Sequence, residues 1–398
     1  MDHKPIRDHR TISRAELAVM GGFRTPWLRA AFDGVDREAF VPERFWGYAT
    51  DEHGAHLVVD RALDEDAWRR EVWNTHRSLI TQMNDHLTPD SGPATGDFSS
   101  SVSALDIVFE KLNRLDVAAG DRILHIGTAS GYDSALLCER VGSALLTTVE
   151  YDPSLAAWGA ENLRAAGYSP TVLCGDGLDG WAPRAPYDRI IATAAVRHIP
   201  VRWRQQAADG AVIVVPFSTL FAGGGLLKLH VRGGDVASGR FVGAASYMWA
   251  RSHRPKHRMN PGPAQPKEAS PIDPEEVFGG GWADRFALGL YVPDVAFSQR
   301  GEGEGRQTQL WDEAGTSVAV VRHGEWWRPS TVTPYGPRNL WRELVGAYSA
   351  WRHAGQPHLT RFGLTLGDGA ADRLWLDEPG RVVRTGGVVS ACAQAPLP

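Results

Sequence analysis

The chain has 398 residues, of which 43% are hydrophobic and 22% charged, an ordinary globular composition that is long enough for two domains. The net charge of -5 gives no general electrostatic reason to bind nucleic acid. Cys138, Cys174 and Cys392 form no CxxC pair, so we expect reduced thiols and no metal site. The charged N-terminus is no secretory signal, and no stretch approaches the ~20 apolar residues of a membrane span. We therefore expect a cytoplasmic protein.

Strand and helix patterns alternate from about residue 103 onward. Leu105, Val108, Leu112 and Leu115 recur at helical spacing and predict a first helix. The elements predicted after it are strand 122–126, helix 134–141, strand 145–149, helix 153–166, strand 171–174, strand 187–192, helix 201–208 and strand 211–216. Because this order is typical of parallel βαβ units, we predict an α/β fold with a doubly wound, Rossmann-like sheet.

The pattern changes after residue 216. Residues 226–231 and 241–249 flank a turn at 233–235 and predict an antiparallel pair of strands. Residues 251–275 are first basic and then rich in proline without apolar periodicity, which is typical of a linker. A helix at 340–351 and short strands within 373–386 then predict a second, smaller α+β domain.

A glycine-rich turn, Gly127-Thr-Ala-Ser-Gly131, joins the predicted strand 122–126 to the next helix. Such a turn lets backbone amides approach a ligand closely. Its spacing differs from the G-x-G-x-x-G pattern of dinucleotide-binding dehydrogenases. Alone, the turn indicates a nucleotide-type ligand only weakly.

Acidic residues follow the next two strands. Glu150 ends one strand, where a carboxylate can accept both hydroxyls of a ribose, and Asp176 follows the other, where it can meet an adenine amino group. Each residue also has a plainer interpretation: Glu150 as a solvated strand end, and Asp176 as a simple turn residue. Together at successive strand ends they favour S-adenosylmethionine. The predicted cofactor-binding residues are Gly127, Thr128, Ser130, Gly131, Tyr132, Glu150, Tyr151, Gly175, Asp176 and Gly177.

The chain resembles protein-L-isoaspartate O-methyltransferases over roughly residues 28–250. The motifs that carry the resemblance, in the family's order, are VDREAFVP, ILHIGTASGYDSALL, VEYDP, GDGLDGW, APYDRIIATAAV and QQAADGAVIVVP. The resemblance implies a carboxyl O-methyltransferase that converts S-adenosylmethionine to S-adenosylhomocysteine. It also implies a peptide or protein substrate. From the net charge and the lack of a long apolar stretch, we expect neither nucleic acid nor a membrane as a partner.

Three positions depart from the family's pattern. His125 stands where an acid commonly faces the methionine amine of the cofactor, and Ala129 replaces the middle glycine of the turn. The family's Thr-Ile-Ser-x-Pro segment, which holds the substrate, is replaced here by a serine-rich loop without the proline. The alternative interpretation of this loop is an ordinary helix cap with a polar linker. The resemblance implies that the substrate carboxylate is held there, by Ser101 with Ser99 and Ser100 beside it.

The expected reaction needs no strong general base, because an ionised carboxylate is already a nucleophile at neutral pH. The enzyme has to align this carboxylate with the methyl group and exclude water. His198 follows the strand 187–192, near the expected cleft. We therefore interpret His198 as structural rather than catalytic.

The whole layout resembles a branch of the family found beside ribosomally synthesised peptides, in graspetide (ATP-grasp) and lanthipeptide systems. The residues that carry this likeness are SLITQ at 78–82, GPRNLWRELVGAY, RFGLT and LWLDEPG. The branch implies methylation of an aspartate side chain in a cyclised precursor, followed by attack of the next backbone nitrogen to give an aspartimide. General repair of isoaspartyl damage and a non-enzymatic cofactor-binding scaffold remain as alternatives.

The predicted organisation has four parts. Residues 1–102 carry an N-terminal segment with the substrate loop, and residues 103–250 form the core that binds S-adenosylmethionine. Residues 251–276 form a basic, proline-rich linker, and residues 277–398 form a C-terminal domain that recognises the substrate.

Overall fold

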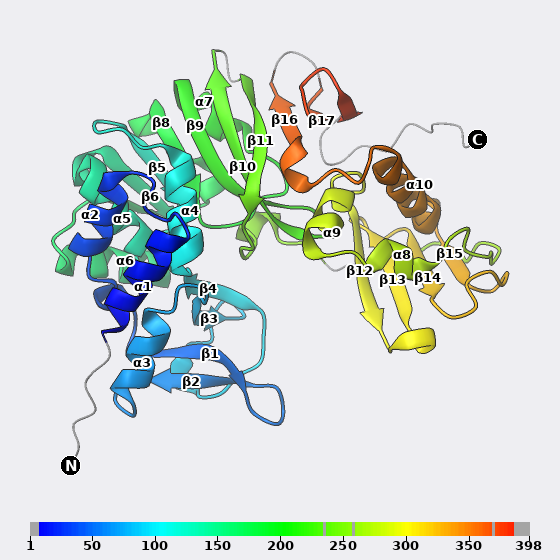
Figure 1. Cartoon of the computed structure of the whole chain (residues 1–398), viewed down its shortest axis with the longest axis horizontal. Helices are drawn as coiled ribbons and strands as arrows, with labels where there is room; N and C mark the ends of the chain where they lie inside the picture. Colours follow the sequence, from blue (N-terminus) through cyan, green and yellow to red (C-terminus); the bar gives the residue numbers. More distant parts are fainter. Residues whose placement is uncertain (1–7, 234–235, 257–258, 368–370, 386–398) are drawn as a thin grey trace. The chain divides into compact units, whose positions relative to one another are not determined.

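The computed structural model describes residues 8–233, 236–256, 259–367 and 371–385 (Figure 1). The chain divides into two compact units. Unit 1 comprises residues 1–194 and 200–214, and unit 2 comprises residues 195–199 and 215–398. Within the described residues, no helix is long and apolar enough to cross a membrane.

A parallel sheet forms the centre of unit 1, with the strand order β9-β8-β5-β6-β7. Strand β9 continues into unit 2. Short apolar runs rich in β-branched residues make these strands, and the helices between them carry the crossover connections. The predicted α/β, Rossmann-like fold is therefore confirmed. The elements are α4 (Leu105–Leu115), β5 (Ile123–Ile126), α5 (Tyr132–Val141), η3 (Ser143–Leu145), β6 (Leu146–Glu150), α6 (Pro153–Ala165), β7 (Thr171–Cys174), η4 (Gly177–Asp179), η5 (Ala182–Arg184), β8 (Tyr187–Ala192), α7 (Val201–Gln205) and β9 (Ala207–Ser218).

The N-terminal part of unit 1 adds helices and a small antiparallel sheet with the order β2-β1-β3-β4. The serine run at 99–101, expected to be a loop, lies in β4, because its backbone pairs with β3. The elements are α1 (His9–Val19), α2 (Pro26–Gly34), η1 (Arg37–Phe40), β1 (Arg44–Thr50), β2 (His56–Asp60), α3 (Glu65–Val72), β3 (Leu79–Met83), η2 (Pro89–Ser91) and β4 (Phe98–Val102).

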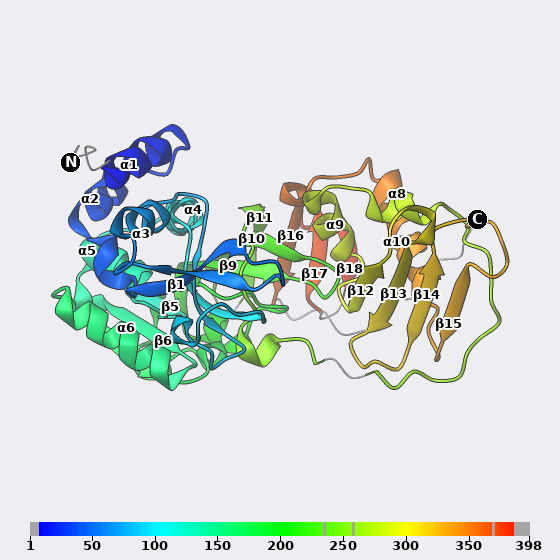
Figure 2. The same ribbon diagram turned by 90° about the horizontal axis from the view of Figure 1, so that it is seen from below.

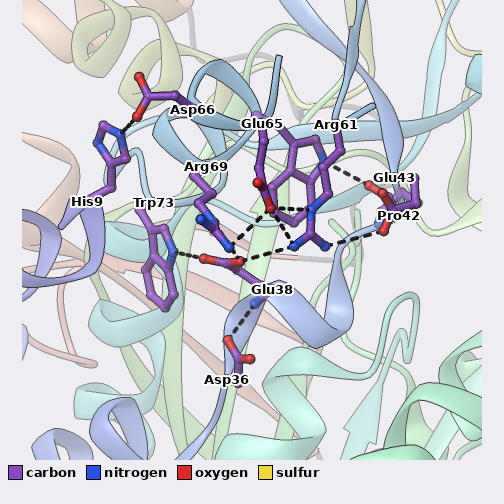
Figure 3. A network of polar contacts seen from close by, with 11 residues as sticks. His9, Asp36, Glu38, Pro42, Glu43, Arg61, Glu65, Asp66, Arg69 and Trp73 are labelled. Atoms are coloured by element: carbon purple, nitrogen blue, oxygen red, sulfur yellow. Dashed lines mark hydrogen bonds and ion pairs between the residues drawn. The ribbon is translucent and has the colours of Figure 1, made fainter. Parts of the chain in front are cut away.

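A polar network fixes the segment VDREAFVP to the neighbouring α3 (Figure 3). The carboxylate of Glu38 accepts from Arg69 Nε at 3.2 Å and from the indole N–H of Trp73 at 2.9 Å. Arg61 lies 4.0 Å from the same carboxylate and also pairs with Glu65 at 3.0 Å. Because these bonds join η1 to α3 and to the end of β2, they hold the small sheet in one position on unit 1.

Unit 2 contains antiparallel strands. The later half of β9 is followed in one sheet by β10, β11, β16, β17 and β18, and a second sheet has the order β12-β13-β14-β15. Figure 2 shows α10 beside the second sheet, where it packs on β13 and β14. The elements are β10 (Gly223–Arg232), β11 (Val236–Ala244), η6 (Arg251–His253), α8 (Pro274–Phe278), α9 (Trp282–Gly289), β12 (Val295–Arg300), η7 (Gly303–Gly305), β13 (Gln307–Asp312), β14 (Val318–Arg322), β15 (Val332–Tyr335), α10 (Leu340–His353), η8 (Leu359–Arg361), β16 (Phe362–Leu366), β17 (Arg373–Leu376) and β18 (Val382–Thr385).

Several expectations for this region need correction. The second strand of the expected pair ends at Ala244 rather than at residue 249, and residues 234–235 of its turn lie outside the described residues. Part of the expected linker packs as structure, because Ala264 and Glu268 form β-bridges to β15. The predicted domain boundaries at residues 250 and 277 remain a proposal. By packing, the main division between the two units falls at residue 215.

Candidate functional site

The glycine turn lies at the carboxyl end of β5, and its backbone leaves no room for larger residues. Gly127 and Gly131 have φ angles of 95° and 90°, which favour glycine. A Cβ on Gly127 would lie 2.3 Å from Thr193 Oγ1, and one on Gly131 would lie 3.0 Å from the carbonyl oxygen of Gly159. Ala129 adopts a φ of 42°, in the left-handed region that costs a residue with a Cβ about 1–2 kcal/mol.

Glu150 lies at the end of β6, next to this turn. Glu150 is only 8% exposed. One carboxylate oxygen accepts the amide N–H of Ala129 at 2.9 Å, and the other accepts the amide N–H of Asp152 at 3.1 Å. These two bonds hold the strained turn and fix the direction of the carboxylate, which can accept further donors on its remaining lone pairs.

The third strand end brings Gly175, Asp176 and Gly177 to the same edge. The amide of Gly175 donates to the carbonyl of Glu150 at 2.8 Å, which continues the pairing of β6 with β7. Asp176 caps η4 by accepting the amide N–H of Leu178 at 3.0 Å. A Cβ on Gly177 would lie 2.4 Å from Ile126 Cγ2, so glycine is required where the chain passes the end of β5.

The other predicted cofactor residues differ in their surroundings. Thr128 is buried and shares a hydrogen bond of 2.7 Å with Thr148 Oγ1, and the Ser130 carbonyl accepts Asn162 Nδ2 at 3.0 Å. Tyr151 is 47% exposed beside Glu150. The Tyr132 ring is buried, and the Arg37 guanidinium carbon lies 4.8 Å from the centroid of this ring. Burial raises the pKa of the Tyr132 hydroxyl to about 12. The Tyr132 side chain is therefore directed into the core.

His125 is completely buried in β5. Its Nδ1 lies 2.8 Å from Ser134 Oγ and 3.2 Å from Thr148 Oγ1, while its Nε2 has no hydrogen-bond partner among the described residues. Burial lowers the pKa of His125 to about 4, so the imidazole is neutral at pH 7. The histidine that replaces the family's acid thus links β5, β6 and α5.

This burial makes the stability of the protein dependent on pH. The pKa of His125 falls from 6.5 to about 4 on folding, so the unfolded state takes up its proton first as the pH decreases. We expect the free energy of unfolding to decrease by up to about 3 kcal/mol between pH 6.5 and pH 4 through this group. Urea unfolding at pH 7.5, 5.5 and 4.5 measures the effect.

The matched variants are His125→Asn, which keeps a polar atom near the Nδ1 position, and His53→Asn at an exposed histidine. The His53 side chain is 82% exposed. The His125→Asn protein should lose part of the acid sensitivity, and the His53→Asn protein should retain it. Equal acid sensitivity in all three proteins would show that His125 does not cause the effect.

The three serines of β4 have different partners. Ser99 Oγ donates to Gln82 Oε1 at 2.9 Å and accepts the Asp85 amide at 3.0 Å. Ser100 is buried and accepts Thr81 Oγ1 at 3.0 Å. Ser101 is half-buried, and its hydroxyl has no side-chain hydrogen bond within the described part of the chain.

Gln82 and Asp152 connect β4 to the edge that carries Glu150, and neither residue is among the sites predicted from the sequence. Gln82 Nε2 donates to Asp152 Oδ2 at 3.1 Å, while Ser99 donates to Gln82 Oε1. The other oxygen of Asp152 caps α6 by accepting the Ser154 amide at 2.8 Å. A glutamine in a fully buried strand and an Asp-Pro pair at a helix start are the signals that could have indicated them.

The residues at these strand ends fit S-adenosylmethionine. A Cβ at Gly127 would collide with Thr193 Oγ1, so the turn at 127–131 needs glycine there to keep its backbone at the strand end, and Glu150 and Asp176 are carboxylates at neighbouring strand ends. Backbone N–H groups suit the anionic end of such a ligand, and carboxylates suit hydroxyl and amino groups. Among the residues that the structure describes, no group of three or more possible metal ligands is found.

The parallel sheet and these strand ends define a Rossmann-like, S-adenosylmethionine-dependent methyltransferase. The family model described as Protein-L-isoaspartate(D-aspartate) O-methyltransferase (PCMT) matches residues 81–235. The Protein-L-isoaspartate O-methyltransferase 1 of Rhodopseudomonas palustris is 30% identical over 254 residues, 60% of this chain and 87% of that protein. The chain belongs to the protein-L-isoaspartate O-methyltransferase family, and is a carboxyl O-methyltransferase with S-adenosylmethionine as methyl donor.

Other relatives show the same family at shorter coverage. The protein of Archaeoglobus fulgidus is 39% identical over 40% of this chain and 77% of its own length. The match with the protein of Ignicoccus hospitalis, at 37% identity, covers 33% of this chain and 63% of that protein. The resemblance predicted from the motifs is confirmed at the level of the family.

A solved structure of a protein-L-isoaspartate O-methyltransferase has the same fold, with a TM-score of 0.53 at 17% identity. The superposition covers 93% of this chain and 100% of that chain. Because the coverage is this high, the shared fold extends into unit 2.

Proposed function

We propose that this enzyme methylates the side-chain carboxylate of an aspartate in a cyclised, ribosomally synthesised peptide, and that the ester then closes to an aspartimide. The observation that carries the proposal is the substrate strand β4. It offers Ser99, Ser100 and Ser101 in place of the family's segment with proline, and only the Ser101 hydroxyl has no side-chain hydrogen bond within the described residues.

The reaction requires the chain to bind the cofactor and the substrate, to orient the substrate carboxylate, and to exclude water from the site. When bound, S-adenosylmethionine supplies an electrophilic methyl group. Glu150, Asp176 and the turn at 127–131 hold the cofactor in the proposal, and Ser101 donates to one oxygen of the substrate carboxylate. The other oxygen is already ionised, so it forms the ester bond without a general base. Alignment of the reacting atoms can be worth several kcal/mol of the barrier.

A preorganised peptide suits this mechanism better than a flexible one. A linear aspartyl peptide samples many conformations, so its carboxylate is rarely in line with the methyl group. Rings formed before methylation restrict these conformations, so less conformational entropy is lost when the carboxylate is aligned in the site. The ester would then lie close to the next backbone nitrogen, whose attack on the ester carbonyl releases methanol and forms the aspartimide.

Repair of isoaspartyl residues in damaged proteins is the second candidate. The relatives' names favour it, and so does a solved protein-L-isoaspartate O-methyltransferase whose fold covers 93% of this chain. In that function the substrate is one flexible isoaspartyl site. The two candidates use the same cofactor site and differ in the conformation of the accepted carboxylate.

Mass spectrometry of two peptides separates these candidates. One is an aspartyl peptide closed by side-chain cross-links, and the other is a linear isoaspartyl peptide. We expect the cross-linked peptide to gain one methyl group and then to show a net loss of one water relative to the starting peptide. The same aspartyl sequence without cross-links serves as the control. It should react at least about tenfold more slowly, because its carboxylate is in line with the methyl group in only a small part of its conformations.

Efficient methylation of the linear isoaspartyl peptide, with no reaction of the cross-linked peptide, would replace the proposal with the repair function. No methyl transfer to any peptide, despite binding of S-adenosylmethionine, would favour the non-enzymatic scaffold.

A further inference from the structure

A series of hydrogen bonds runs through unit 1 from the strand β4 to the end of β6. Ser99 Oγ donates to Gln82 Oε1 at 2.9 Å, and Gln82 Nε2 donates to Asp152 Oδ2 at 3.1 Å. The amide N–H of Asp152 donates to Glu150 Oε1 at 3.1 Å, and Glu150 Oε2 accepts the amide N–H of Ala129 at 2.9 Å. These consecutive bonds connect a serine of β4 to the glycine-rich turn.

The chemistry of the partners fixes the orientation of the Gln82 amide. A carboxylate only accepts, so the NH₂ group of Gln82 points to Asp152 and its carbonyl oxygen points to Ser99. The Ser99 hydroxyl donates its one proton to Gln82 and accepts the amide N–H of Asp85 at 3.0 Å. Gln82 and Asp152 are each 5% exposed, so water competes little for the bond between them.

Asp152 is held in place by α6. The carboxylate oxygen that does not bind Gln82 accepts the amide N–H groups of Ser154 and Leu155 at 2.8 and 3.2 Å, which caps the first turn of this helix. Asp152 therefore keeps a fixed position relative to β6 and α6, and it gives the side chain of Gln82 a fixed partner.

The strand β4 is less firmly held. It is the last strand of its sheet, with β3 as its neighbour. The register between β3 and β4 shifts on both sides of the pair formed by Gln82 and Ser100. Irregular pairing lets a strand bend, and serine does not favour strands. The bond between Gln82 and Ser99 therefore helps to determine where β4 lies relative to the end of β6.

We propose that Gln82 is a positioning residue that couples cofactor binding at Glu150 to the order of β4. Cofactor hydroxyls bound to Glu150 restrict this carboxylate, and with it the amide of Asp152 that donates to it. Gln82 transmits the restriction to Ser99, so the strand that carries Ser101 is ordered when the cofactor site is filled. The inference rests on the proposed function, because it takes β4 as the strand that meets the peptide.

Hydrogen–deuterium exchange of the full-length protein tests the proposal, with S-adenosylhomocysteine as the probe. We expect saturating probe to slow the exchange of residues 98–102 by at least about fivefold, the lower end of the usual coupling between two sites. Gln82→Met keeps the length of the side chain and removes both of these bonds. This variant should bind the probe without a change in the exchange of the segment, and calorimetry gives the concentration that saturates each protein.

Thr81→Val is the matched control. Thr81 precedes Gln82 in β3, is buried and donates to Ser100 Oγ at 3.0 Å. The valine variant also removes a side-chain bond between β3 and β4, but it leaves the path to Asp152 intact, so the effect of the probe should persist. Because a buried substitution can disturb folding, Ser99→Ala breaks the path at its half-buried end and should abolish the effect as Gln82→Met does.

The proposal would be overturned if the probe leaves the exchange of residues 98–102 unchanged in the original protein, or slows it equally in Gln82→Met and Ser99→Ala. Loss of the effect in Thr81→Val as well would indicate a general loosening of the sheet and would also overturn it. The measurement needs no peptide. Slowed exchange through Gln82 without methyl transfer to the cross-linked peptide would contradict the proposed function alone, whereas methyl transfer without slowed exchange would contradict the coupling.

Discussion

Replacing Glu150 by alanine should raise the dissociation constant for S-adenosylmethionine by about 10- to 100-fold, corresponding to ~1–3 kcal/mol. Two losses add in this variant. The proposed hydrogen bonds to the ribose hydroxyls disappear, and the amides of Ala129 and Asp152 lose the carboxylate that accepts them at 2.9 and 3.1 Å. Since Ala129 has a left-handed φ of 42°, the turn loses a bond that holds its strained residue.

Titration calorimetry measures this effect, and Glu161→Ala is the matched control. Glu161 lies on α6 in the same unit, and its side chain is 60% exposed. The control variant should bind S-adenosylmethionine as the original protein does. An unchanged affinity in Glu150→Ala, with the fold retained by circular dichroism, would show that Glu150 does not hold the cofactor.

Replacing Ser101 by alanine should lower kcat/KM by about 10- to 100-fold and leave cofactor affinity nearly unchanged. A hydrogen bond to a charged group contributes about 1.5–3 kcal/mol, and each 1.4 kcal/mol corresponds to about tenfold in rate. The Ser101 hydroxyl has no side-chain hydrogen bond within the described residues, so its removal should cost little stability. The effect should therefore appear in turnover.

Ser100→Ala provides the opposite pattern. Its hydroxyl accepts Thr81 Oγ1 at 3.0 Å within the small sheet, so the variant should lose about 1 kcal/mol of stability and retain most of its turnover. Initial rates and thermal unfolding of both variants distinguish the two roles. If Ser100→Ala impairs turnover more than Ser101→Ala, the assignment of the substrate hydroxyl is wrong.

The residues of the proposed cofactor edge could be grouped from the sequence for a physical reason. Consecutive parallel strands place their carboxyl ends at one edge of a sheet, so the turn at 127–131, Glu150 and Asp176 could be brought together from chain order alone. The glycine positions also followed from local chemistry. Gly127 and Gly131 have positive φ angles, and backbone or side-chain atoms occupy the place of a Cβ.

The substrate side was harder to predict, because it depends on non-local pairing. Serine does not favour strands, and β4 forms because residues 98–102 pair with β3. The link from Ser99 through Gln82 to Asp152 joins residues up to 70 positions apart in sequence. His198 and His253 are 55 positions apart, and nothing in the basic segment at 251–258 indicates that His253 is buried.

Transfer of a tritiated methyl group from S-adenosylmethionine to the cross-linked aspartyl peptide tests the central claim most directly. A carboxyl methyl ester releases methanol in mild base, whereas methyl groups on nitrogen remain attached. We predict tritiated methanol in the volatile fraction with the original protein, and a loss of at least about tenfold in Ser101→Ala. Methyl groups that stay on the peptide after base treatment, or equal transfer by both proteins, would contradict it.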